Sequence, residues 1–441
     1  MMSTISYLIR FLQSMSVLAL SAVIVTGLLI SASPALGGTF YVSPGGNDAN
    51  SGTVGAPWRT IGKAASTLVA GDTAILMNGT YIEPEVQFDR SGTGSQPITL
   101  QAQNKHQAML SSTSSCNPNI SVYGSYITID GLSLVINPSN VYCTPNSAAG
   151  TGVRCWQGAV GCVVRNIKTD DPTGPSGKIR SHGVKTNQPN SLIEDNELGA
   201  GVETLGGDNI IIRRNLITGG GEWNNGIVTK GGGHNVQVYN NYVNAPSMSG
   251  WGLLLGGSNA SDNPPQECFN CVAYNNVIRS SASFRAMGFQ GCKDCAFYNN
   301  IGFGGALAMN PAPSSTNINN TWKNNILDCQ GSNATENLLG NYTIDYNLFF
   351  NCTGTPSQVH SITGNPLFVN PSSDWHLRAG SPALNAGTAV TVTGLNGGVI
   401  PVNLDMDGKL RTAPWDLGIY AVNGVIGDIT APAAPVNVRI Q

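Results

Sequence analysis

Hydrophobic and polar residues alternate along most of the chain, in short stretches that end on one or two asparagines. This alternation has a period of two, which is typical of β-strands that turn one face towards a core. Long stretches with the 3.6-residue period of a helix are almost absent. The repeated phrase occurs as VVRNIKT, LIEDNEL, IIIRRNLI, VQVYNNYV, CVAYNNVI, CAFYNNIG, TWKNNIL and TIDYNLFF. These stretches predict a fold made almost entirely of strands.

The spacing of the repeat predicts a solenoid. The matching asparagines are Asn166, Asn196, Asn215, Asn241, Asn276, Asn300, Asn325 and Asn347. Their separations range from 19 to 35 residues, as expected for a constant strand-turn unit with loops of varying length. Asparagines stacked at a turn can hydrogen-bond along the column and form a ladder. We therefore predict an all-β parallel β-helix.

The chain can be divided into four parts. Residues 38–110 should form an N-terminal cap and the first coils, because Ile61, Ala64, Ala65 and Leu68 share one face of a short helix that Gly71 could end. Residues 111–423 should form the coils and a closing segment. Residues 424–441 are rich in proline and alanine and are interpreted as a linker or tail. Residues 1–37 precede the cap and have a different character.

The first 37 residues are typical of an export signal. Arg10 provides positive charge, an apolar stretch runs from about residue 15 to residue 30, and SASPALGG offers small residues for cleavage. We expect a secreted, extracellular protein without stable membrane insertion after cleavage. A retained membrane anchor is the alternative, although serines interrupt the apolar stretch.

Composition limits the possible partners. Only 11% of residues are charged and the formal net charge is -3, so we expect no nucleic-acid partner and no general attraction to an anionic membrane. A polyanion would have to bind to a local cationic patch. We expect a monomer.

The ten cysteines fit an oxidising compartment, where disulfides persist. Cys268-x-x-Cys271 and Cys292-x-x-Cys295 have nearly the spacing of a zinc site. However, the same 24-residue offset relates the Tyr-Asn-Asn triplets that follow them, so the cysteines belong to the structural repeat. Disulfides or a buried cysteine ladder are therefore favoured over zinc.

Both ends of the chain resemble a known family. The stretch FYVSPGGNDANSGTVGAPWRTIGKAAS and the later NPLFVNPSSDWHLRAGSPALNAG resemble secreted right-handed parallel β-helix proteins of the polysaccharide-lyase type, whether pectate-lyase-like or chondroitinase-B-like. This resemblance implies a right-handed β-helix and an acidic polysaccharide as partner. It is less specific for activity, because such β-helices include lyases, glycoside hydrolases and epimerases.

Aligning consecutive coils on their turns brings possible reactive side chains together. Lys185 falls near Glu203 of the next coil, and Lys230 aligns with Leu205 below it and Leu255 above it. A lysine in a column of leucines is unexpected for packing alone, because an unpaired buried ammonium group is costly. Its head group should reach solvent or lie in a groove.

A lyase that acts on uronic acids needs a base beside the sugar carboxylate and cations that neutralise this carboxylate. NGIVTKGGGHN is similar to the lysine-bearing coil of chondroitinase-B-like and alginate lyases, which implies that Lys230 is the base. Arg285 is the candidate for neutralising the carboxylate, although it lies one coil beyond the position expected from the family. Calcium is a further candidate, held by the oxygen donors Glu203, Glu222, Asn224 and Asn225.

The same region supplies candidates for substrate binding. They are Trp223, Trp251, His182, Lys185 and His234. The sequence thus predicts a lyase that cleaves an acidic, uronic-acid-containing polysaccharide by β-elimination. One alternative is a β-helix glycoside hydrolase that uses Asp170, Asp171 and His182. Another is a non-catalytic glycan-binding or cell-surface protein.

Overall fold

The computed structural model describes residues 37–113, 117–136, 150–170, 182–220, 225–244, 249–258, 264–281, 285–312, 315–356, 358–393, 399–422 and 425–426. The chain divides into two compact units, residues 1–37 and residues 38–441. All elements described below belong to the second unit. The predicted signal segment therefore lies outside the described residues, apart from Gly37. Among the residues that the structure describes, no helix has the length and hydropathy that a bilayer-spanning segment needs.

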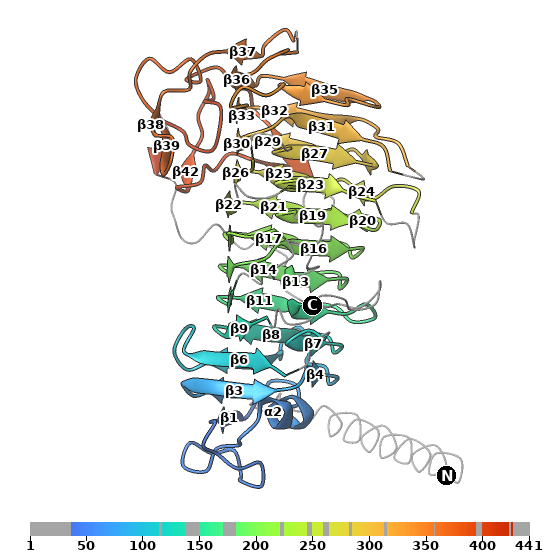
Figure 1. The fold of residues 1–441 in the computed structure, drawn as a ribbon, viewed down its shortest axis with the longest axis vertical. Coiled ribbons are helices and arrows are strands. Elements are labelled where there is room, and N and C mark those ends of the chain that lie inside the picture. Colours follow the sequence, from blue (N-terminus) through green and yellow to red (C-terminus); the bar gives the residue numbers. More distant parts are fainter. Residues whose placement is uncertain are drawn as a thin grey trace, which may run out of the picture. The chain divides into compact units, whose positions relative to one another are not determined.

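Each coil of the second unit passes through three parallel sheets in turn. In one such coil the chain runs through β13 (His182–Thr186), β14 (Leu192–Glu194) and β15 (Glu197–Leu198) before β16 (Val202–Leu205) begins the next coil. β16 pairs with β13 in parallel register, so each coil stacks on the one before it. Figure 1 shows this stacking from the blue N-terminal coils to the orange C-terminal ones. The predicted parallel β-helix is confirmed.

The three sheets extend along nearly the whole solenoid. Sheet 1 contains β1 (Thr39–Val42), β2 (Thr73–Leu76), β5 (Ile98–Ala102), β8 (Ile127–Asp130), β11 (Val163–Arg165), β14, β17 (Ile211–Arg213), β21 (Gln237–Tyr239), β25 (Val272–Tyr274), β29 (Ala296–Tyr298), β32 (Asn320–Lys323) and β35 (Tyr342–Asp345). Sheet 2 contains β4 (Val86–Phe88), β7 (Ile120–Val122), β10 (Thr151–Cys155), β13, β16, β19 (Ile227–Lys230), β23 (Leu253–Gly256), β27 (Met287–Gln290), β31 (Leu307–Asn310) and β34 (Thr335–Glu336). Sheet 3 contains β3 (Gly79–Glu83), β6 (Ala108–Ser112), β9 (Ser133–Val135), β12 (Lys168–Thr169), β15, β18 (Leu216–Ile217), β22 (Tyr242–Asn244), β26 (Val277–Arg279), β30 (Ile301–Phe303), β33 (Ile326–Asp328), β36 (Leu348–Phe350) and β37 (Ile362–Thr363).

Smaller sheets lie at one corner and near the C-terminus. The corner sheet contains β20 (Gly233–His234), β24 (Cys268–Phe269) and β28 (Cys292–Lys293). The antiparallel pairs are β38 (Phe368–Asn370) with β39 (Asp374–Leu377), β40 (Thr391–Thr393) with β41 (Val399–Pro401), and β42 (Lys409–Leu410) with β43 (Val425–Ile426).

A buried asparagine ladder joins the coils, as predicted. Its members are Asn196, Asn215, Asn241, Asn276, Asn300, Asn325 and Asn347, and each side-chain nitrogen donates to the side-chain oxygen of the next member at 2.8–3.0 Å. Asn166 is not a member, which corrects the sequence alignment. It occupies the preceding left-handed turn position with φ 54°, and Ile167 stands in the ladder column, where its backbone N–H donates to Asn196. Asparagine tolerates that left-handed conformation, so the single asparagine of this phrase serves the turn.

The predicted cap is the helix α2 (Ile61–Thr67). The Thr60 side chain accepts a hydrogen bond from the Lys63 backbone N–H, and the Glu83 carboxylate accepts from the backbone N–H groups of Ile61 and Gly62. These contacts satisfy N–H groups that the first turn leaves free. The helix ends at Thr67, earlier than the predicted Gly71.

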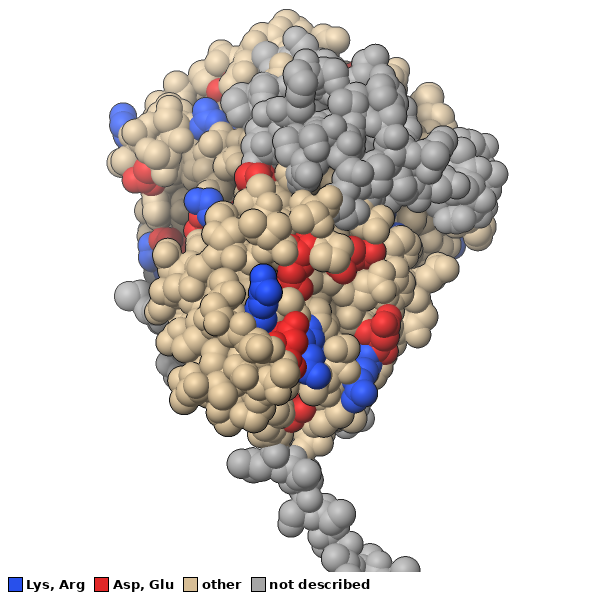
Figure 2. Space-filling model, turned by 60° about the horizontal axis from the view of Figure 1, so that its bottom comes forward, with Lys and Arg blue, Asp and Glu red and all other residues tan. Residues whose placement is uncertain are grey.

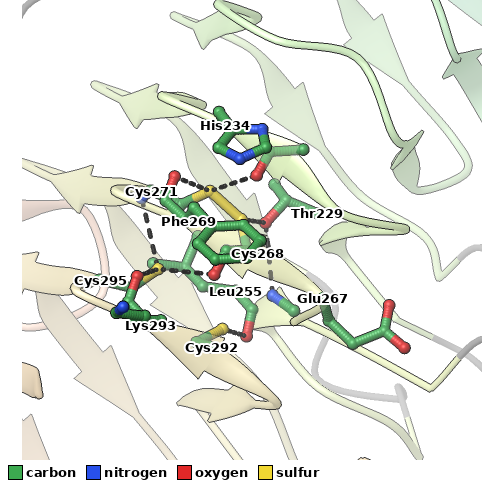
Figure 3. The surroundings of a disulfide bond; sticks show 12 residues. Thr229, His234, Leu255, Glu267, Cys268, Phe269, Cys271, Cys292, Lys293 and Cys295 are labelled. Carbon is green, nitrogen blue, oxygen red and sulfur yellow. Dashed lines mark hydrogen bonds between the residues drawn. A yellow bond between two sulfur atoms is a disulfide. The ribbon is translucent and has the colours of Figure 1, made fainter. Parts of the chain in front are cut away.

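Three disulfides stabilise the described coils, two of them within one coil and one between neighbouring coils. Disulfides join Cys155 to Cys162, Cys268 to Cys271 and Cys329 to Cys352. Cys292 and Cys295 are buried free thiols on the next coil, with Cys292 in register with Cys268 (Figure 3). The Cys295 sulfur lies within 4.8 Å of the disulfide sulfurs of Cys268 and Cys271. The structure thus combines a disulfide with a stacked cysteine pair, in line with the preference for these features over zinc.

Candidate functional site

Three successive strands of sheet 2 carry a repeated Gly-Val-charged phrase, which appears as GVR in β10, GVK in β13 and GVE at the start of β16, where the glycine directly precedes the strand. Its valines, Val153, Val184 and Val202, lie in the main core. Side chains alternate along a strand, so the charged residues that follow the valines project from the outer face. Arg154 pairs in register with Lys185, and Lys185 pairs with Glu203. The predicted proximity of Lys185 and Glu203 is thus present.

Glu203 is the centre of a cluster of cationic groups. Its Oε1 lies 2.5 Å from Lys185 Nζ, and its Oε2 lies 3.0 Å from Lys230 Nζ and 3.5 Å from His182 Nε2. The Glu203 side chain is only 4% exposed, and those of the two lysines are 14% and 13% exposed. The charges of the cluster are therefore largely shielded from water. Electrostatic interactions between them are stronger there than they would be in bulk solvent.

Burial and neighbouring charges shift the acid–base behaviour of the cluster. Burial by itself would raise the pKa of Glu203, but His182, Lys185 and Lys230 hold this pKa well below its usual value. Burial lowers the pKa of Lys185; Glu203 opposes this shift, while Arg154 and Lys230 add to it. Lys185 is therefore easier to deprotonate than an ordinary lysine.

Arg154 extends the cluster towards the N-terminal coils and was missed among the sequence candidates. It is 6% exposed, and its Nε and Nη1 have no hydrogen-bond partner among the residues that the structure describes. Burial lowers its pKa to about 10. The repeated Gly-Val-charged phrase was the signal that could have placed Arg154 in the same column as Lys185 and Glu203.

Lys230 ends β19 and pairs with Leu205, as predicted. The predicted alignment with Leu255 is wrong, because Leu255 pairs with Thr229. The glycine runs that follow the two strands give a misleading alignment, because the strands pair one residue out of step with those runs. A slip of one residue changes the face to which a side chain points. A Cβ atom at Gly257 would lie 2.8 Å from Lys230 Cβ, so this glycine leaves room for the lysine stem.

The outer face of sheet 2 becomes apolar beyond Lys230. Val228, Trp251, Leu254 and Ala308 form a cluster separate from the main core. The Trp251 ring lies over Gly288, where a Cβ atom would come within 2.0 Å of it, and the Arg285 guanidinium lies 4.9 Å from the ring centroid. Trp251 is 8% exposed, so its ring packs on the sheet and does not offer an open face.

Arg285 does not join the Glu203 cluster. It forms an ion pair with Glu336, and it precedes Met287 by two residues at the start of β27. Lys230 instead follows Ile227, the residue in register with Leu253 and Met287, by three residues. The two positions are thus separated by about 16 Å along the strand direction and by two coils. The structure does not bring these two candidates into one site.

The remaining candidates lie apart from the cluster or outside the described residues. His234 is exposed on β20, where its Nδ1 lies 2.9 Å from Asp208 and its ring stacks on Phe269. The Asn225 side-chain oxygen accepts a hydrogen bond from the Trp251 backbone N–H. Glu222, Trp223, Asn224 and Asp171 lie outside the described residues.

The described members of the predicted calcium set do not fit a calcium site. Both carboxylate oxygens of Glu203 face ammonium groups, so a divalent cation there would lie beside Lys185 and Lys230. Calcium prefers several free oxygen ligands around it, and like charges repel in such a buried setting. The Glu203 cluster is better suited to an anion than to a metal ion.

Charged side chains are sparse on the face of the molecule that Figure 2 shows. In Figure 2, Lys and Arg side chains alternate with Asp and Glu side chains on one face, and most of the described surface around them carries neither kind. A cationic patch on this protein is therefore a local feature, as the low charge content led us to expect.

Comparison with known proteins places the fold. Residues 40–190 match the family model of the Pel9A-like right-handed β-helix region. This segment is similar to that family. It includes Arg154, His182 and Lys185 and ends before Glu203. The resemblance to right-handed β-helix proteins of the polysaccharide-lyase type, inferred above from the sequence, is confirmed.

Individual relatives support this assignment over limited lengths. A 68-residue stretch is 41% identical to pectate lyase PEL9 of Emericella nidulans and covers 15% of this chain and 17% of that protein. The chain spans only 22% and 17% of the length of the two curated relatives that it matches.

Two solved structures extend the likeness in fold to most of the chain. The complex of XylC with xylose has a TM-score of 0.59 at 12% identity and covers 87% of this chain and 98% of that one. A GH136 lacto-N-biosidase from Eubacterium ramulus has a TM-score of 0.54 at 15% identity and covers 71% of this chain and 64% of that one. At these identities the likeness shows a shared fold.

Proposed function

We propose that this protein is a lyase that cleaves an acidic, uronic-acid-containing polysaccharide by β-elimination. The observation that carries the proposal is the surplus of cationic groups around Glu203 on the outer face of sheet 2. Such a cluster attracts a carboxylate, and it stabilises the negative charge that develops there when the neighbouring C–H proton is removed. The likeness to pectate lyase PEL9 over a short stretch supports the same reaction class.

Burial favours Lys185 as the base, and we assign Lys230 to the binding of the sugar carboxylate. A lysine must be neutral to accept a proton, and burial already lowers the pKa of Lys185. Removal of the proton beside the carboxylate forms a carbon–carbon double bond as the glycosidic C–O bond breaks. The leaving oxygen takes up a proton, and an unsaturated sugar remains at the new chain end. This assignment exchanges the roles that the sequence suggested for the two lysines.

The test is an ultraviolet assay of the unsaturated product. Purified protein is incubated with polygalacturonate, alginate and chondroitin sulfate, each with calcium and with chelator. A rise in absorbance on one polymer supports the lyase and identifies its substrate. New reducing ends without unsaturated product would identify a hydrolase, and no product on any polymer would leave a glycan-binding protein. No step of the proposal depends on calcium, so a requirement for calcium would have to come from another site.

We also propose that the protein is exported, with residues 1–37 removed as a signal peptide. The basic residue, apolar stretch and small residues of this segment support the proposal. N-terminal sequencing of protein recovered from the culture medium tests it. Intact Met1 on cell-associated protein alone would contradict it.

A further inference from the structure

Two stacked aromatic residues lie on the outer face of sheet 2, towards the N-terminal side of the Glu203 cluster. Tyr123 and Trp156 directly follow Val122 and Cys155, which pair in register between β7 and β10. Their ring centroids are 5.6 Å apart and the rings are nearly parallel, with an angle of 5° between them. Tyr123 is 40% exposed, although an aromatic side chain of this size gains most when it is covered.

Surrounding contacts hold the Trp156 ring in place. Its Nε1 donates to Ser121 Oγ at 3.0 Å, and the Arg154 guanidinium lies 4.5 Å from the ring centroid. Arg154 in turn pairs in register with Lys185. The aromatic pair is therefore a fixed platform that borders directly on the cationic cluster.

Register gives the separation between the platform and Lys230. Cys155, Thr186, Thr204 and Thr229 pair one after another across successive strands. Trp156 follows the first of these residues and Lys230 follows the last, so they lie in the same column three coils apart. At the spacing of neighbouring strands this is about 14 Å along the solenoid axis.

Two further residues near the platform, Glu85 and Asp89, are acidic. Asp89 is exposed and follows Phe88, which pairs with Val122, so it lies one coil below Tyr123. Glu85 accepts a hydrogen bond from Ser121 Oγ. Carboxylates are good acceptors for sugar hydroxyl groups, but they repel a sugar carboxylate. A sugar on this platform would be recognised by its apolar face and hydroxyls, whereas the lysine pair recognises charge.

We propose that Tyr123 and Trp156 form a stacking subsite for a distant sugar unit of the same glycan chain that the lysine pair binds. The glycan then runs along the solenoid axis, across the strands of sheet 2, and only a chain long enough to bridge the three coils uses both places. This inference rests on the proposed function for its ligand. It adds the direction of the bound chain and a dependence of affinity on chain length.

The test is calorimetric binding of galacturonate, mannuronate and chondroitin oligomers, each series extending from two to eight units. A Lys185→Met background, which should not cleave them, is combined with Tyr123→Ala, Tyr123→Phe or the matched control Tyr342→Ala. Tyr342 is similarly exposed at 36% but lies on sheet 1. We expect Tyr123→Ala to weaken the longest oligomers of the series that binds by about three- to tenfold and to leave dimers unaffected. Tyr123→Phe and Tyr342→Ala should bind like the background.

Each outcome separates this inference from the proposed function. A length-dependent loss in Tyr123→Ala supports the subsite, even if the wild-type protein cleaves nothing and the lyase proposal fails. Equal loss for dimers and octamers, no loss at any length, or no binding of any oligomer would overturn the subsite. If Tyr123→Ala keeps full turnover on a polymer and binds the oligomers unchanged, the lyase proposal is retained and the Tyr123 subsite is rejected. Added salt should weaken binding at the lysines. The ratio between the affinities of the background protein and of Tyr123→Ala should not change with salt.

Discussion

Sheets 1 and 2 each carry a column of charged residues on the outer face, and the two columns differ in the balance of positive and negative charge. On sheet 1, Arg165 pairs with Asp130, while Arg213 and Arg214 pair with Glu194. Arg214 also contacts Asp195, so three arginines face three carboxylates. On sheet 2, Lys185 and Lys230 contact Glu203, and Arg154 lies one coil from Lys185. Among the described residues, Glu203 is the one carboxylate within ion-pair distance of these three cationic residues.

Both columns are built in the same way, from strands stacked in parallel register, so the scaffold does not explain the difference. The sheet 1 column satisfies its own charges, as expected for a structural ladder. The sheet 2 column keeps positive charge in excess and leaves two Arg154 nitrogens without a hydrogen-bond partner among the described residues. Buried groups left in this state are costly, and they are characteristic of sites that bind a ligand. The imbalance, more than the presence of charge, marks the site.

Replacing the base should have the largest effect. Lys185→Met removes the proposed proton acceptor and should lower kcat by at least about 100-fold, the usual range for loss of a general base. Lys230→Met should mainly raise KM, because it removes a charge that binds the substrate. Lys168→Met is the matched control, since Lys168 is 54% exposed and lies 3.9 Å from Glu197 on sheet 3. Equal turnover in Lys185→Met and Lys168→Met would remove Lys185 from the mechanism.

Neutralising the central carboxylate should have the largest effect on stability. Glu203→Gln leaves buried ammonium groups without their counter-ion, and breaking a buried pair in this way costs about 3–5 kcal/mol. Glu194→Gln on sheet 1 should cost only about 1–3 kcal/mol, because Arg213 keeps its hydrogen bond to Tyr239 and Arg214 keeps Asp195. Urea unfolding at pH 7 measures both. If Glu194→Gln lost more free energy of unfolding than Glu203→Gln, the sheet 1 column would depend more on its carboxylate than the sheet 2 column does.

Lowering the pH should show how much the ionised Glu203 carboxylate stabilises the wild-type protein. The pKa of Glu203 is held well below its usual value of 4.5, so the folded state favours the ionised form. The stability that this contributes is fully present above the unfolded pKa and is lost as pH falls through the folded pKa. Glu203→Gln should show a weaker fall in stability below about pH 4.5. An unchanged fall would assign the acid sensitivity to other carboxylates.

The pH dependence of turnover should follow Lys185. Its pKa is lowered from 10.5, so the neutral, proton-accepting form appears at lower pH than for an exposed lysine. We expect kcat to rise with pH and to level off with a midpoint below 10.5. Arg154→Met removes a positive charge that helps to lower this pKa, so it should move the midpoint upwards. A midpoint that does not move would separate the titrating group from Arg154.

The coil architecture could be predicted from the sequence because its determinants are local and repeated. Alternating valines and isoleucines fix the inward face, and the recurrent asparagines fix one turn, which the ladder confirms from Asn196 to Asn347. The asparagine signal fails at one position, because the left-handed turn also favours asparagine there. Asn166 serves the left-handed turn instead of the ladder.

The site was harder to predict, because it depends on register between coils. Lys185 and Glu203 share the position after Gly-Val, so their contact could be predicted. The glycine runs predict a pairing of Lys230 that is one residue out of step with the next strand, because glycine runs in loops do not fix strand pairing. The burial of Trp251 depends on Gly288 one coil away, and no feature of its own segment signals this.

The smallest expected effect is the change in the free energy of unfolding caused by Arg154→Met. This variant also tests most directly whether the two columns differ in charge balance. Arg154→Met replaces a buried guanidinium, which has two unpartnered nitrogens among the described contacts, with an apolar side chain of similar length. The free energy of unfolding should change by no more than about 1 kcal/mol, because little hydrogen bonding is lost. Arg213→Met on sheet 1 breaks bonds to Glu194 and Tyr239 and should cost about 2–3 kcal/mol. Urea unfolding of the two variants measures the difference, and a loss in Arg154→Met as large as that in Arg213→Met would show that Arg154 stabilises the fold, as the balanced column does. If stability is kept while the affinity for the glycan falls, Arg154 is retained in the protein for its charge.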